Sequence, residues 1–127
     1  MAFFKRKKNL PESAELDWKE KNAALIEAIN KADIETALAL GQEMVDYVDR
    51  TMRRDNPKKA TTYNNMGMVF MMNGDYELAD ECFRDALAMR KRIFGKDHNE
   101  IAVILLNMAE LYRRQATGIM SQNRVEA

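Results

Sequence analysis

The chain repeats itself at a constant offset of 42 positions, and this repeat is the feature that most constrains its fold. Displaced by 42, the stretch TTYNNMGMVFMM (61–72) aligns with VILLNMAELYRR (103–114). Displaced the other way, NGDYELADECF (73–83) aligns with KADIETALALG (31–41). A repeat of this length predicts equivalent units that stack side by side, because one unit is too small to bury its own apolar face.

Capping residues and apolar periodicity predict that each unit is a pair of helices. The expected helices are 13–30, 34–54, 57–72, 76–94 and 99–116, and 117–127 is expected to be a tail or a short last helix. The expected N-caps are Ser13, Asp33, Asn56 and Asp75, and Pro57 suits a first helical position. Gly74 and Gly95 stand where a positive φ is needed. The predicted fold class is all-α, an alpha-alpha superhelix of about two and a half antiparallel helix pairs. The predicted repeats are 18–59, 60–101 and a partial 102–116, within a domain at 13–116.

Composition agrees with one helical domain and narrows the function. Of 127 residues, 46% are hydrophobic, and only five are Gly and two Pro. The formal charge is zero, but the run KRKK (5–8) carries +4 and leaves the rest near −4, which argues against nucleic-acid binding. A single cysteine, Cys82, permits no internal disulfide and favours a cytoplasmic location. No apolar run is long enough to predict a transmembrane helix.

No residue pattern indicates catalysis. His98 is the only histidine and has no partner spacing for a metal, and Cys82 has no histidine to activate it. We therefore expect no enzyme activity, no cofactor and no metal site. The basic segment 1–12 is expected to be a flexible tail; the alternative, contact with an anionic membrane surface, rests on Phe3 and Phe4 beside the basic run.

The second repeat resembles the tetratricopeptide repeat. The first helix of that repeat family has a large residue, a Leu-like residue, a small residue and an aromatic residue in order, and here these are Tyr63, Met66, Gly67 and Phe70. The second helix has a small, an aromatic and a small residue, and here these are Ala79, Phe83 and Ala86. The third repeat keeps Leu105, Met108, Ala109 and Tyr112, whereas the first has Lys21, Leu25 and Gly41 at the positions of Tyr63, Gly67 and Phe83. The period of 42 and the stretch IFGKDHNEIAVILLNMAELY are similar to the kinesin light chain type of this family. The resemblance implies a right-handed stack of helix pairs that binds protein.

Asparagines recur on the helices that would line the inner face of such a stack. The resemblance implies that Asn65 and Asn107 bind the backbone of an extended peptide, since an amide both donates and accepts hydrogen bonds. Methionines beside them suit varied apolar side chains, and an arginine could take an acidic group. The predicted peptide-binding residues are Lys19, Ile26, Asn65, Met68, Met72, Asn107 and Arg114. The alternative is that both asparagines are solvated or bond between helices. Met66 and Met108 are predicted to lie in the core.

The predicted function is a non-enzymatic protein–protein interaction module that binds an extended peptide or a partner helix in a groove. The alternative is a self-associating chain or a small subunit of a larger assembly, in one version a membrane-surface adaptor. Self-association is suggested by an apolar flank on the unpaired last helix, formed by Val103, Leu106, Leu111 and their neighbours. The expected partners are therefore another protein, a peptide or a second copy of this chain, without nucleic acid and without a membrane.

Overall fold

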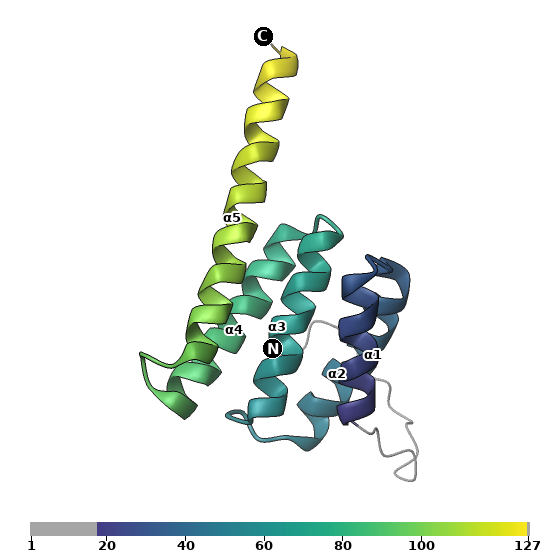
Figure 1. Cartoon of the computed structure of the whole chain (residues 1–127), viewed down its shortest axis with the longest axis vertical. Coiled ribbons are helices and arrows are strands. Elements are labelled where there is room, and N and C mark those ends of the chain that lie inside the picture. Colours follow the sequence, from purple (N-terminus) through teal and green to yellow (C-terminus); the bar gives the residue numbers. More distant parts are fainter. Residues whose placement is uncertain (1–17, 127) are drawn as a thin grey trace.

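The computed structural model describes residues 18–126, which form five helices joined by short turns (Figure 1). The helices are α1 (Trp18–Asn30), α2 (Ile34–Thr51), α3 (Pro57–Met72), α4 (Tyr76–Phe94) and α5 (Asn99–Glu126). Each helix packs antiparallel to the next along the chain, and α3 also contacts both α1 and α5. The predicted all-α class is confirmed, and the arrangement is consistent with a stack of helix pairs. The predicted tail at 1–12 lies outside the described residues.

Two helix starts carry the caps that the sequence predicts. The carboxylate of Asp33 accepts a hydrogen bond from the backbone N–H of Thr36 at 3.3 Å, at the start of α2. The side-chain oxygen of Asn56 accepts from the N–H of Lys58 at 2.8 Å, and Pro57 opens α3. Both caps satisfy backbone donors that a helix start would otherwise leave unpaired. The expected cap Ser13 lies outside the described residues.

Other helix ends differ from the prediction. Asp75 stands at the N-cap position of α4, but its carboxylate accepts from the amide of Asn73 at 2.7 Å instead of capping the helix. Helix α2 ends at Thr51 and not at residue 54, because the backbone becomes extended at Met52. The two glycines meet their predicted role, with φ of +82° at Gly74 and +81° at Gly95.

Helix α5 is longer than predicted. The helix expected over 99–116 continues without a break to Glu126, so most of the expected tail belongs to α5. Nothing in this segment stops a helix: it contains no proline, and Gly118 stands in the helix interior. Along the predicted apolar flank, Val103 and Leu106 are exposed as expected, whereas Leu111 is fully buried because it faces the core.

The core is closely packed where α3 crosses α4. A Cβ built on Gly67 would stand 2.5 Å from the Phe83 ring, so the absence of a side chain there lets the ring approach the helix. At the equivalent positions of the first repeat, Leu25 is buried on α1, and Gly41 on α2 lies against Met66 of α3, whose sulfur a Cβ on Gly41 would overlap. The prediction that Met66 and Met108 lie in the core is confirmed, because both side chains are buried.

The described helices can also be compared with the requirements of a membrane span and of a metal site. None of them combines the length and the apolar character that crossing a membrane requires. Residues 18–126 contain no group of His, Cys, Asp and Glu placed to hold a metal ion. Cys82 is a free and buried thiol, and burial, the largest cause, raises its pKa. It is therefore a packing residue on α4 and not an exposed nucleophile.

Candidate functional site

Helices α1, α3 and α5 lie side by side, with α3 in the middle (Figure 1). On α3 the side chains that keep contact with solvent follow one helical stripe, which contains Thr61, Met68 and Met72. Equivalent stripes on the neighbouring helices contain Lys19 and Ile26 on α1, and Val103, Glu110 and Arg114 on α5. We call these three stripes together the α1–α3–α5 face.

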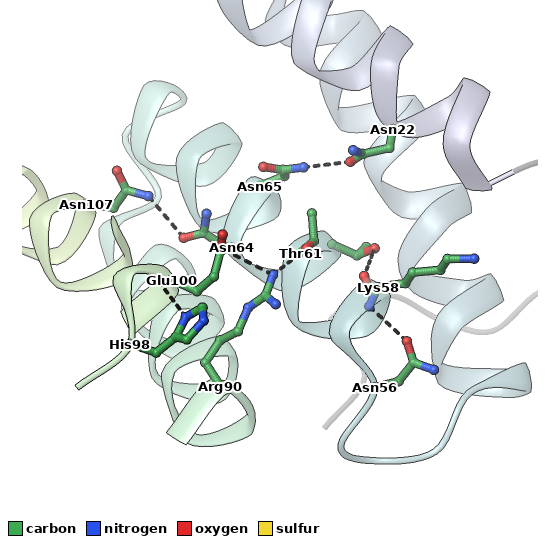
Figure 2. Close-up of polar contacts among 11 residues, drawn as sticks. Asn22, Asn56, Lys58, Thr61, Asn64, Asn65, Arg90, His98, Glu100 and Asn107 are labelled. Carbon is green, nitrogen blue, oxygen red and sulfur yellow. Dashed lines mark hydrogen bonds and ion pairs between the residues drawn. The ribbon is translucent and has the colours of Figure 1, made fainter. Parts of the chain in front are cut away.

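Two asparagine pairs tie the three helices together (Figure 2). The amide of Asn65 on α3 donates to the side-chain oxygen of Asn22 on α1 at 2.8 Å. The amide of Asn107 on α5 donates to the side-chain oxygen of Asn64 on α3 at 3.0 Å. Helical geometry places the stripe of Thr61, Met68 and Met72 between the directions of Asn64 and Asn65. The open stripe of α3 is therefore bordered by one amide pair on each side.

The pairing changes the role that the sequence suggests for Asn65 and Asn107. Asn65 is only 7% exposed, and each of the two amides bonds to a neighbouring helix, the alternative that the sequence left open. One such bond uses a single N–H and a single carbonyl oxygen, while an asparagine pair holds four N–H donors and two oxygens. Hydrogen-bonding capacity therefore remains at both borders of the stripe. Contact between a peptide and Asn65 or Asn107 stays a prediction.

Sequence reasoning missed the other half of each pair, Asn22 and Asn64. Both are half-buried and supply the accepting oxygens. A signal was present: 43 positions separate Asn22 from Asn65, and Asn64 from Asn107, one more than the repeat. An offset of one residue rotates a side chain by about 100° around its helix. The two asparagines of each pair therefore point toward each other, whereas residues at the same repeat position point in the same direction.

A second set of polar contacts anchors the start of α3. The indole N–H of Trp18 on α1 donates to the hydroxyl of Thr62 at 2.9 Å. Arg90, buried on α4, donates to the hydroxyl of Thr61 at 2.5 Å and lies 3.6 Å from the carboxylate of Glu100 on α5 (Figure 2). A buried arginine needs such partners, since its charge cannot be left unpaired. These bonds fix α1 and α5 against α3.

The α5 edge of the face carries an excess of positive charge. Glu110 accepts hydrogen bonds from Arg113 at 2.7 Å and from Arg114 at 3.0 Å. Bonds from Arg113 first, and then from Arg114, lower the pKa of Glu110 to about 2, so the carboxylate stays ionised. One carboxylate then balances two guanidinium groups. The half-buried Arg114 offers an acidic group its remaining N–H donors.

The remaining predicted site residues also lie on this face. Met68 and Met72 are half-buried and pack against the core from the open stripe of α3. Lys19 and Ile26 are exposed on α1, on the same side as Asn22. The structure therefore brings the seven predicted residues to one surface, with Asn65 and Asn107 at its internal borders.

The opposite side of α3 has a depression in which Lys59 and Arg92 are held in ion pairs. It is lined by residues of α3, α4 and the turn before α3, among them Lys59, Tyr63 and Arg92. Lys59 lies 3.6 Å from the carboxylate of Asp49, which also accepts from the Tyr63 hydroxyl, and Arg92 bonds to Asp55 at 2.6 Å. This depression therefore carries no ligand-binding assignment.

Comparison with protein families agrees with the architecture. Residues 58–116, which span α3, α4 and much of α5, match the model of the tetratricopeptide repeat. This part of the chain therefore matches the tetratricopeptide repeat, a class that is in general a protein–protein interaction module and usually not catalytic. The kinesin light chain type stays a prediction, because the match reaches only the broader family. No curated protein matches the chain.

Proposed function

We propose that the chain is a non-catalytic binding module that takes an extended peptide or a partner helix along the α1–α3–α5 face. The observation that carries the proposal is the open stripe of α3, in which two methionines lie between two asparagine pairs. Apolar and amide groups alternate there across three helices. That combination suits a polypeptide, which presents side chains and backbone amides together.

Each part of the face has a role in this proposal. Met68 and Met72 contact apolar side chains, since a thioether side chain adapts its shape to different partners. The asparagine pairs form hydrogen bonds with the peptide backbone. At one pair Asn107 forms them directly. At the other pair they are formed by the side-chain amide of Asn22, which Asn65 holds in place. Lys19 and Arg114 favour acidic groups at the two edges, because Glu110 balances only part of the charge beside Arg114.

Preorganisation supports the proposal. The two pairs and the bonds of Trp18 and Arg90 hold α1, α3 and α5 in fixed register before any partner arrives. A rigid face loses less conformational freedom on binding than a flexible one, which favours affinity. Exposed Ile26, at the α1 edge, adds apolar area that the chain itself does not cover.

The experiment is a selection of peptides from a random display library with the full chain, followed by affinity measurements on the selected peptides. We expect Ile26→Glu and Arg114→Glu each to weaken binding by about tenfold or more, a loss of about 1.4 kcal/mol. Leu78→Glu is the matched control, because Leu78 is exposed to a similar degree but lies on α4, outside the face.

Two further measurements sharpen the result. Asn65→Ala combined with Asn107→Ala tests the amide borders, with the melting temperature recorded to separate folding from binding. The proposal fails if no peptide is selected, or if Ile26→Glu and Leu78→Glu bind the selected peptides equally well. Equal affinity of the double asparagine variant, at an unchanged melting temperature, would remove the asparagines from the site.

A further inference from the structure

Helix α5 carries an apolar stripe that residues 18–126 leave largely exposed, although the hydroxyl of its Tyr112 bonds to Asp80 and Arg84 of α4. The exposed members recur at intervals of three and four, and they are Ala102, Leu105, Ala109, Tyr112, Ala116 and Ile119. The buried side of α5, which faces α4, is formed by other residues, among them Ile104 and Leu111. The stripe extends into the half of α5 that projects past the other helices (Figure 1), where Ile119 is 61% exposed. An apolar stripe of this length marks an interaction surface.

The internal repeat shows what such a stripe does elsewhere in the molecule. Its first four positions correspond, at the offset of 42, to Ala60, Tyr63, Gly67 and Phe70 on α3. All four of those residues are buried, and Gly67 lies directly against Phe83 of α4. The same chemistry on α5 therefore needs an antiparallel helix at close range.

Two properties of the stripe indicate the occupant. Small residues recur every seven positions (Ala102, Ala109, Ala116), and large ones do the same (Leu105, Tyr112, Ile119). This is the heptad spacing of paired helices. When a second copy of α5 is laid antiparallel about a twofold axis between residues 110 and 111, every alanine meets a large residue. Ala102 faces the partner's Ile119, Leu105 faces the partner's Ala116, and Ala109 faces the partner's Tyr112.

We propose that two copies of the chain associate through this stripe as an antiparallel α5–α5 pair. A twofold interface uses the same patch on both subunits, so the patch must be complementary to itself. The stripe meets this condition over its full length in one register, and the small residues let the two helix axes approach closely. The same register brings Leu106, which is 70% exposed, beside the partner's Met120.

One flanking residue opposes the pairing. Arg113 lies next to the stripe and approaches the partner's Arg113 near the twofold axis. Each of these guanidinium groups makes two hydrogen bonds to Glu110, at 2.8 and 2.7 Å, which largely offsets the repulsion. The contact then has an apolar centre and residual like charge. The dimer is therefore expected to strengthen when salt is added.

The dimer does not depend on the proposed peptide site. On α5 the stripe and the α1–α3–α5 face point to different sides of the helix, separated by the residues that pack on α4. Peptide binding measured through Ile26 should therefore survive when the dimer is lost. Failure of one proposal leaves the other standing.

The first test is the mass of the full chain in solution, by light scattering or sedimentation, from about 1 µM to about 1 mM. We expect the mass to rise from 14.7 kDa toward twice that value. Ala109→Arg should weaken the dimer by at least about tenfold, because a bulky charge replaces a small residue in the seam. Ser121→Arg is the control on an exposed position of α5 off the stripe, and it should dimerise like the unmodified chain. Circular dichroism should show both variants folded, since both positions are exposed.

The second test fixes the register by disulfide cross-linking. The variants Leu105→Cys and Ala116→Cys should cross-link with each other when mixed, while each alone should not, since two copies of one position lie far apart in the antiparallel pair. Buried Cys82 stays out of the reaction. A chain that remains a monomer throughout the range, equal dimerisation of Ala109→Arg and Ser121→Arg, or cross-linking of either variant with itself would each overturn the proposal.

Discussion

At Gly67, core packing and helix propensity favour different residues. Gly67 is a poor helix former in the middle of α3, and replacing it with alanine in an open helix would stabilise by about 1 kcal/mol. Here the new Cβ would stand 2.5 Å from the Phe83 ring, in a core without spare room. The close approach of α4, and not the preference of α3, therefore decides which residue fits.

We predict that Gly67→Ala lowers the free energy of unfolding by about 1 to 2 kcal/mol, because the overpacking cost exceeds the gain in propensity. Gly118→Ala is the control: it makes the same substitution, but it should raise the free energy of unfolding rather than lower it. A Cβ at Gly118 meets nothing within 4 Å, so propensity alone acts and the helix gains stability. Urea denaturation of both variants checks the pair, and a stabilised Gly67→Ala would contradict the account.

At the scale of the elements, the relation between neighbouring helices rests on the amide pairs as well as on apolar contacts. Asn22 and Asn65 couple α1 to α3, and α1 otherwise buries few side chains of its own. A buried amide has to find a partner, so the pair admits fewer relative positions of the two helices than apolar packing alone would. The result is a fixed register for the first repeat.

We predict that a double-mutant cycle of Asn22→Ala and Asn65→Ala gives a favourable coupling of about 1 kcal/mol in the free energy of unfolding. The corresponding cycle of Asn64→Ala and Asn107→Ala should give a smaller value, because neither of those residues is as buried as Asn65. Chemical denaturation of the four single and two double variants measures both couplings. A coupling near zero at the Asn22–Asn65 pair would mean that apolar contacts alone set the register.

The helices also show which parts of the structure could be predicted from the sequence. The helices were predictable because their caps and repeats are local signals, as at Asp33 and Asn56. The continuation of α5 to Glu126 was not, because the apolar periodicity ends at Ile119 and the last turns pack against nothing in the described chain. The site residues could be assigned to one face from helical periodicity. The pairing of Asn64 and Asn65 with different neighbours could not, because it depends on how adjacent helices are rotated.

The whole molecule is a stack whose centre is better packed than its ends. Helices α3 and α4 contribute half of the largest fully buried side chains, and each has a neighbour on both sides. Helix α1 closes one end with a narrow buried edge. Helix α5 is anchored by its first half, while residues 116–124 are all exposed. In such a one-dimensional arrangement each helix is stabilised chiefly by its neighbours, so stability falls from the centre outward.

This gradient predicts the order of amide hydrogen exchange. In solution dilute enough to keep the chain monomeric, α3 and α4 should exchange slowest, because opening them requires unfolding the whole stack. The part of α5 after residue 116 should exchange fastest, since its helical bonds lack tertiary support. Exchange followed by mass spectrometry measures both. Equal protection of α4 and residues 117–124 in dilute solution would contradict the gradient, because cooperativity would then extend to a segment that packs against no other described helix.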